Sequence, residues 1–132
     1  MSLSIVGTWR LVRAEAVDGD GEPLPPPYGG AQAMGLLSFN ADGRMMAVLC
    51  DGRPALREGE VREYNSYCGN YTFDGKQLIT KVDASTSAIR LGSEQVRDVT
   101  TERDLMVLRP PKRVHEEGVE QRTLYWEKIS AV

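Results

Sequence analysis

One arginine in the middle of an otherwise strand-like stretch is the first candidate for chemistry. Arg97 lies between Val96 and Asp98, and an arginine that faces the interior of a protein without a partner is energetically expensive. If Arg97 faces inward, it needs a carboxylate or an anionic ligand. If it faces outward, it is an ordinary surface arginine. The sequence leaves both orientations open for Arg97, and it leaves them open for Lys81 in the same way.

Three tyrosines and a methionine complete the candidate ligand-binding set. Tyr64, Tyr67 and Tyr71 follow one another at short spacing, and each offers an apolar ring and one hydroxyl that can orient a small ligand. Met46 adds adaptable apolar surface, although methionine and tyrosine serve a packed core equally well. We therefore expect a cavity lined by members of the set Met46, Tyr64, Tyr67, Tyr71 and Arg97, with Arg97 meeting an acidic group.

The chain shows no recognisable nucleophile–base pair. Ser38 and Ser85 have no histidine near them in the sequence, because His115 is the only histidine. Cys50 and Cys68 form no CxxC motif, and together with one distant histidine they make a poor zinc site. We expect two free thiols, no metal and no cofactor. No catalytic residue is assigned, and the question of enzymatic activity stays open.

Length and composition bound the classes of protein that can carry such a cavity. The 132 residues are 41% apolar and 27% charged, which is typical of one globular domain over residues 1–132. The net charge of −3 argues against a broad nucleic-acid or anionic-membrane surface. No apolar stretch approaches the roughly 20 residues of a transmembrane helix, and the first residues do not resemble a secretory signal. We therefore expect a cytoplasmic protein without membrane insertion.

The regular elements that must position these residues are predicted to be β-strands. Asp-Gly pairs at 18–19, 42–43, 51–52 and 74–75 punctuate runs of β-forming residues, and such pairs are a strong hairpin signal. Eight strands are expected, over Ile5–Val17, Met34–Asn40, Arg44–Cys50, Cys68–Phe73, Gln77–Ala84, Gln95–Thr101, Leu105–Arg109 and Gln121–Ile129.

Two segments interrupt this pattern of strands. The segment Pro23–Tyr28 contains four prolines, so we expect a stiff, extended first loop. The segment Arg53–Tyr67 is rich in helix-favouring residues, and it predicts a helical turn or short helix before the fourth strand.

The order of the strands favours a closed barrel. Sequential hairpins predict an eight-stranded antiparallel up-and-down barrel with one or two short helices, because closure removes the exposed edges of such a sheet. An eight-stranded barrel is filled by side chains or holds one small ligand. Several strands are apolar on both faces, for example around Met45 and Met46, so alternation alone does not identify the inner face.

An ordered set of short motifs resembles a known family. The resemblance is to the lipocalin and fatty-acid-binding (calycin) barrels, and more closely to the small bacterial and fungal lipocalin-like domain proteins. It covers nearly the whole chain. The motifs, in chain order, are Gly7-Thr8-Trp9-Arg10-Leu11, Tyr28-Gly29, Gly35-Leu36-Leu37-Ser38-Phe39, Asp42-Gly43-Arg44-Met45, Tyr67-Cys68-Gly69-Asn70-Tyr71-Thr72, Gln95-Val96-Arg97 and Leu124-Tyr125-Trp126-Glu127-Lys128.

The resemblance implies an up-and-down barrel with an internal cavity. It also implies that Gly7 and Trp9 belong to the barrel floor, with an arginine from a late strand, Arg97 or Arg122, packed on the indole. One strand departs from the pattern, because it has Thr80 and Lys81 where relatives often carry histidines. Histidine-dependent chemistry in relatives is therefore not carried over to this chain.

Three functions remain open from the sequence. The first is a binding protein for a small, largely apolar molecule, with or without an acidic group. The second is an enzyme of secondary metabolism, such as an isomerase, cyclase or hydratase, that uses the cavity as its active site. The third is a structural accessory protein with a filled interior, and a homodimer is an open alternative. The expected partner in the first case is a small hydrophobic ligand, with no nucleic acid involved.

Overall fold

The computed structural model describes residues 3–131 as an almost entirely β-stranded chain. Two short 3₁₀ segments, η1 (Pro27–Gln32) and η2 (Ala88–Arg90), are its only helical turns within those residues. The strands are β1 (Gly7–Val17), β2 (Met34–Phe39), β3 (Arg44–Cys50), β4 (Tyr64–Phe73), β5 (Gln77–Ser85), β6 (Glu94–Glu102), β7 (Leu105–Arg109), β8 (Arg113–His115) and β9 (Gly118–Ser130).

The strands close into an antiparallel up-and-down barrel. Each strand from β1 to β6 pairs with the next, β7 pairs with β9, and β9 pairs with β1, so eight strands form the wall. At the closing seam Trp9 lies opposite Lys128, and Leu11 lies opposite Trp126. The short strand β8 pairs only with β9 and extends one end of the wall as a hairpin. The predicted eight-stranded barrel is confirmed, and β8 is an addition to it.

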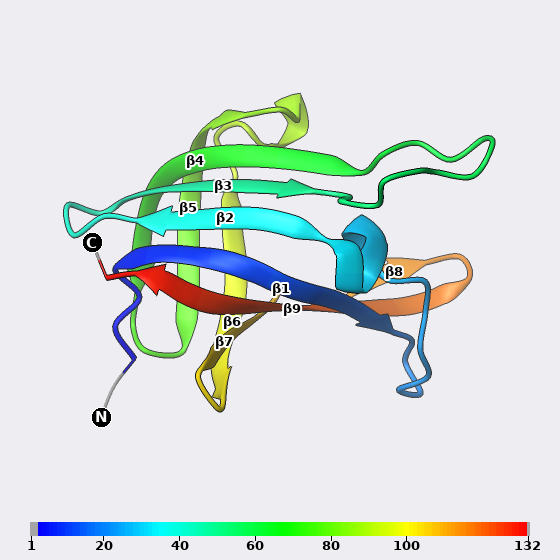
Figure 1. Ribbon diagram of the computed structural model, residues 1–132. Helices are drawn as coiled ribbons and strands as arrows, with labels where there is room; N and C mark the ends of the chain where they lie inside the picture. The colour runs from blue at the N-terminus through cyan, green and yellow to red at the C-terminus, as the bar shows by residue number, and fades with distance from the viewer. Residues whose placement is uncertain (1–2, 132) are drawn as a thin grey trace.

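The connections between strands differ sharply at the two ends of the barrel. Short turns at 40–43, 74–76 and 103–104 join strands at one end, which we call the closed end. Long connections at 18–33, 51–63, 86–93 and 110–117 all lie at the other, the open end. Figure 1 shows the loop between β3 and β4 and the β8 hairpin projecting on the same side of the molecule. The open end therefore has the length of chain needed to build a site.

Alternation along β3 shows which face of the wall points inward. Met45 is 1% exposed, whereas its neighbour Met46 is 61% exposed. Ala47 and Leu49 are buried with Met45, and Val48 is exposed with Met46. Because successive side chains in a strand point to opposite faces, this parity assigns the odd-numbered residues of β3 to the barrel interior.

Trp9 and Gly7 lie at the closed end, beside the seam. Trp9 is 2% exposed, and its indole Nε1 donates a hydrogen bond to the carbonyl of Ile5 at 2.9 Å. Gly7 has a φ of +132°, and a Cβ at this position would lie 2.3 Å from the carbonyl oxygen of Ser130. The close approach of β1 to the end of β9 therefore needs a residue without a side chain.

The cation that faces Trp9 is a lysine. The Nζ of Lys128 lies 5.2 Å from the centre of the indole ring. The expectation of Arg97 or Arg122 in this role is wrong, because both residues lie near the beginnings of their strands, at the open end. Lys128, near the end of β9, is carried to the closed end by the direction of the strand.

The predicted helical turn within Arg53–Tyr67 is also wrong. Residues 51–63 form an irregular loop, and β4 already begins at Tyr64. Pro54 lacks an N–H and Gly59 has a φ of +86°, so neither suits a helix interior. The buried carboxylate of Asp51 holds the loop, because it accepts hydrogen bonds from the backbone N–H of Arg53 at 3.0 Å and from its guanidinium at 2.6 Å. Local side-chain contacts here replace helical hydrogen bonds.

Within residues 3–131, neither 3₁₀ segment has the length or the apolar character that crossing a membrane requires. The same part of the chain contains Cys50 and Cys68 as free thiols, as expected.

Candidate functional site

A small cavity opens at the open end of the barrel. Its volume is about 50 Å³. It adjoins two open hollows of about 310 and 290 Å³, with which it shares lining residues. Apolar side chains from the barrel wall line the cavity together with polar ones. The apolar and aromatic members are Tyr28, Leu37, Leu49, Tyr67, Leu108, Pro110, Leu124 and Trp126.

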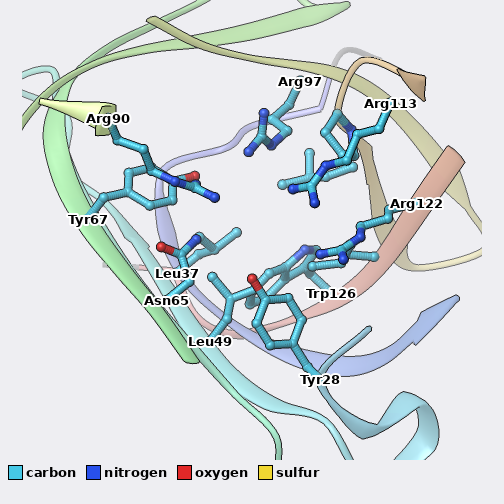
Figure 2. Close-up of a pocket in the computed structure, with 13 residues that line it drawn as sticks. Tyr28, Leu37, Leu49, Asn65, Tyr67, Arg90, Arg97, Arg113, Arg122 and Trp126 are labelled. Atoms are coloured by element: carbon cyan, nitrogen blue, oxygen red, sulfur yellow. The ribbon is translucent and has the colours of Figure 1, made fainter. Parts of the chain in front are cut away.

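Four arginines surround this cavity: Arg90, Arg97, Arg113 and Arg122. They come from four different elements, namely η2, β6, β8 and β9. Figure 2 shows their guanidinium groups around one space, with Arg97, Arg113 and Arg122 on one side and Arg90 beside Tyr67 across from them. We call these residues the arginine ring. Asn65 is the only other polar non-aromatic residue in the described lining.

The guanidinium of Arg97 has only neutral partners among residues 3–131. It donates to the side-chain oxygen of Gln95 at 2.9 Å and to the carbonyl of Val96 at 2.8 Å. Burial is the largest cause that lowers the pKa of Arg97, and the charges of Arg90 and Arg113 lower this pKa further. The site thus holds Arg97 in surroundings that disfavour its positive charge.

Arg90 and Arg113 are also without a carboxylate partner in the described part of the chain. Arg90 donates to the same Gln95 oxygen that Arg97 uses, at 3.2 Å. Arg113 lines the cavity and both hollows, and its side chain makes no ion pair and no hydrogen bond within residues 3–131. One amide oxygen is therefore the shared acceptor for two of the four guanidiniums.

Arg122 is the exception in the arginine ring. Its Nη1 lies 3.2 Å from a carboxylate oxygen of Glu63, and its Nε lies 3.4 Å from one of Glu120. The other oxygen of Glu63 accepts a hydrogen bond from the backbone N–H of Tyr28 at 2.8 Å. Glu63 therefore joins the loop before β4 to η1 and to β9, while it neutralises Arg122.

Tyr28 is held in an uncommon backbone conformation next to the cavity. Its φ of 56° lies in the left-handed region, which non-glycine residues seldom adopt. Burial and then the charge of Glu63 raise the pKa of its hydroxyl. Strain of this kind persists only where surrounding contacts fix the residue, and here the hydrogen bond to Glu63 does so.

Trp126 supplies a buried donor without an acceptor. The side chain is 1% exposed and lines the cavity, and its Nε1 has no hydrogen-bond partner among residues 3–131. Figure 2 shows Trp126 below the arginines, with Leu37, Leu49 and Tyr28 around the same space. An indole N–H that is buried usually finds a partner, so this unsatisfied donor marks a place where a ligand atom can accept.

The sequence-predicted ligand residues separate into three groups. Arg97 and Tyr67 line the cavity, and Tyr64 lines one adjoining hollow with 59% of its surface exposed. Met46 lies on the outer face of β3, away from the cavity. Tyr71 lies toward the closed end, where its ring packs edge-on against Phe39 and its hydroxyl donates to the carbonyl of Asn40 at 2.7 Å. Lys81 is exposed.

Sequence reasoning missed several residues that line the cavity, chiefly Tyr28, Asn65, Arg90 and Arg113. A usable signal was the alternation of connections in an up-and-down barrel. Every second connection lies at the same end of such a barrel, so the four long connections had to lie together at one end. Arginines in or beside those connections were therefore candidates for one site.

The lining of the cavity, within the described residues, contains arginines, tyrosines and an asparagine but no histidine and no carboxylate. Nowhere in residues 3–131 do three or more metal-ligating side chains gather in a way that could hold a metal ion. Chemically, the arrangement offers positive charge and hydrogen-bond donors above an apolar floor. It is suited to hold an anion whose remaining atoms are apolar.

The chain thus forms a closed eight-stranded antiparallel up-and-down barrel with a cavity at one end. The family model of the lipocalin-like domain matches residues 6–129, so the chain belongs to the lipocalin-like domain family. Among curated proteins, none matches the chain.

Proposed function

We propose that this protein binds a small, largely apolar molecule with an acidic group, and that Arg97 contacts the acidic group. The observation that carries the proposal is that Arg97 lines a small cavity while its guanidinium has only Gln95 and a backbone carbonyl as partners. A carboxylate in the cavity would accept charge-assisted hydrogen bonds from Arg97 and restore the stability of its charged form. The fold of the family supports binding of a small molecule in the barrel.

The remaining lining supports the apolar part of such a ligand. Leu37, Leu49, Leu124 and Trp126 form apolar surface below the arginine ring. Ligand sites commonly combine such surface with a few polar groups that fix orientation. Here the acidic end would lie toward Arg97, and the unsatisfied N–H of Trp126 would donate to a further oxygen.

The test is a binding series of carboxylic acids and their methyl esters, measured by calorimetry on the wild-type protein and on Arg97→Met. If Arg97 contacts the carboxylate, the substitution weakens acid binding by roughly 10- to 100-fold and leaves the esters nearly unchanged. Arg57→Met is the matched control, because Arg57 lies in the exposed loop before β4 and lines no pocket described above. Equal weakening of acids and esters would remove Arg97 from the binding contacts, and no binding of either would overturn the proposal.

The enzyme alternative receives less support from the same residues. Proton transfer near neutral pH is usually carried out by histidine or by a carboxyl group with a raised pKa. The described lining of the cavity has neither, and burial raises the pKa of Tyr28 further from neutrality. The two free thiols agree with the cytoplasmic location that we propose for the protein.

A further inference from the structure

We propose that the natural ligand carries two negative charges, as a phosphate monoester or a dicarboxylate does, and that Arg90 and Arg113 bind the second charge. This inference rests on the proposed function and extends it. Of the four residues in the arginine ring, only Arg122 has carboxylate partners among residues 3–131. Arg90, Arg97 and Arg113 thus bring three uncompensated positive charges to one cavity, and one carboxylate would leave two of them unmatched.

Electrostatics within the arginine ring favours a doubly charged partner. Burial is the main cause that lowers the pKa of Arg97, and the charges of Arg90 and Arg113 lower it further, so each of these two guanidiniums disfavours the charge of Arg97. Repulsion of like charges in partly buried surroundings is weakened most when opposite charge of similar size is placed between them. A dianion supplies that charge with several acceptor oxygens, and guanidinium groups suit both phosphate and carboxylate geometry.

The hydrogen-bond donors also exceed the acceptors that the protein provides. Arg90 and Arg97 share a single oxygen of Gln95. Arg113 lies on the exposed strand β8, and its side chain has no acceptor among the described residues. Trp126 adds a buried N–H without a partner on the floor of the same cavity. The four or more oxygens of a dicarboxylate, or the terminal oxygens of a phosphate monoester, match this surplus of donors better than two carboxylate oxygens do.

The dimensions of the site indicate how such a ligand is placed. The small cavity, at about 50 Å³, has room for a compact group but not for a long alkyl chain. The adjoining hollows of about 310 and 290 Å³ are both lined by Arg90 and Arg113. We therefore place the first charged group beside Arg97, with the apolar atoms next to it against the cavity floor, and the second charged group in a hollow, within reach of Arg90 and Arg113.

Two matched pairs of ligands separate one charge from two and phosphate from carboxylate. The first pair is phenyl phosphate and methyl phenyl phosphate, and the second is glutarate and its monomethyl ester. At constant ionic strength and neutral pH, calorimetry should give at least about tenfold tighter binding for the dianion of one pair. The pair that shows the preference identifies the kind of anion. If the mono- and dianion of each pair bind equally well, the inference is overturned.

Three variants assign the second charge to residues. We expect Arg90→Met and Arg113→Met each to weaken the preferred dianion by about tenfold and to remove most of its advantage over the half-ester. Arg97→Met should weaken the dianion and the half-ester alike, and Arg57→Met should change neither. If Arg90→Met and Arg113→Met weaken both members of a pair equally, the second charge is not bound by these residues and the inference fails.

A pH series provides an independent readout. The second proton of a phosphate monoester is lost near pH 6, so, if the phosphate pair shows the preference, binding of phenyl phosphate should strengthen from about pH 5 to pH 7. Methyl phenyl phosphate has no second proton, and it is the control for the ionisable groups around the site, which include Glu63, Glu94 and the His115–Glu120 pair. The same pH profile for both esters would contradict the inference.

These experiments distinguish failure of the inference from failure of the proposed function. If monoanions bind, lose affinity in Arg97→Met and bind as tightly as dianions, the proposed function stands and the dianion is wrong. If neither member of either pair binds, and no carboxylic acid binds, both proposals are overturned.

Discussion

The closed and open ends of the barrel are built by the same strands, but they differ in whether their polar groups have partners within the protein. At the closed end, tight turns bring the strands together, and the indole N–H of Trp9 is bonded to the Ile5 carbonyl. At the open end, two long connections and strand β6 bring three guanidiniums without carboxylate partners around the cavity, and the N–H of Trp126 has no acceptor among the described residues. The indole donor at the closed end is thus bonded within the protein, whereas the open end has hydrogen-bond donors without an acceptor among the described residues.

The comparison teaches that the length of the connections separates the sealed end of this barrel from the end that carries the proposed ligand site. Short turns leave no chain to place side chains above the barrel, so their end is sealed by side chains of the wall, such as Phe39 and Met45. Long connections lose more conformational entropy on folding, and here they are fixed by ion pairs such as those of Asp51 and Glu63. Substitutions at the two ends should therefore differ in what they change.

The largest effect on stability is expected at the closed end. Trp9→Ala should lower the free energy of unfolding by about 3–5 kcal/mol, because it removes a large buried ring from a packed floor. Urea unfolding followed by circular dichroism measures this loss. Tyr64→Ala at the open end is the control, and we expect a change within about 0.5 kcal/mol because Tyr64 is largely exposed. A loss below about 1 kcal/mol for Trp9→Ala would mean that the closed end is not sealed by this residue.

The next effect concerns the carboxylate that orders the open end, and it depends on pH. The hydrogen bonds from the Arg53 side chain and backbone lower the pKa of Asp51 from 3.8 to about 2. A carboxyl group with a lowered pKa stabilises the folded protein above its unfolded pKa, and this contribution is lost as the pH falls from about 4 to about 2. The stability difference between wild type and Asp51→Asn should therefore be constant near neutral pH and shrink over that acidic range.

Urea unfolding at a series of pH values tests the behaviour of Asp51. Asp20→Asn is the control, because Asp20 is exposed and its side chain makes no ion pair within residues 3–131. A wild-type advantage over Asp51→Asn that does not change with pH would contradict the role of the ionised carboxylate.

A smaller change in the free energy of unfolding is expected within the arginine ring, and there one substitution should leave stability unchanged or increase it. Arg97→Met should leave the free energy of unfolding unchanged or raise it by up to about 2 kcal/mol, because it removes a partly buried charge that has no carboxylate partner. Arg122→Met should instead lower it by about 1–2 kcal/mol, since Glu63 and Glu120 lose their cation. Thermal unfolding of both variants without ligand measures the contrast. If Arg97→Met destabilises the protein as much as Arg122→Met does, Arg97 is a structural residue.

The smallest effect returns to the closed end. Lys128→Met should cost about 0.5–1 kcal/mol, the usual size of a cation–aromatic contact at an accessible site. Lys81→Met, which changes an exposed lysine on β5, should cost less, and differential denaturation of the two variants provides the measurement. Equal costs would show that the contact between Lys128 and Trp9 contributes nothing measurable.

Most strands of the barrel wall could be predicted from the sequence, but little of the structure of the connections at the open end could be. The Asp-Gly turns and the alternation of side chains are local signals, and they placed most strands to within a few residues. The exceptions are the beginnings of β4 and β9 and the whole of β8. The inner face of β3 could not be chosen, because Met45 and Met46 are chemically alike and only the tertiary structure separates them. The segment before β4 was predicted as helical from propensity, which the contacts of Asp51 and Arg53 override.

The candidate site was predicted only where one strand carried an unusual residue. Arg97 stood out because it interrupts a strand, and Tyr67 because tyrosines cluster around it. Arg90 and Arg113 lie in connections, where a charged residue is ordinary, so their type gave no signal. Arg90 and Arg113 could be recognised as site residues only from the barrel topology, which places alternate connections at the open end.

The seam between β1 and β9 has a consequence for the time course of folding. Arg10 and Glu127 form an ion pair across it although they are 117 positions apart, whereas the β2–β3, β4–β5 and β6–β7 hairpins join neighbouring residues. Loop-closure entropy makes such distant pairing slow, so the hairpins can form early and the seam is expected to close last. Until then β1 and β9 are two free, complementary edges, and another chain in the same state can exchange strands with them. The interval before closure is therefore when the protein is most exposed to misassembly.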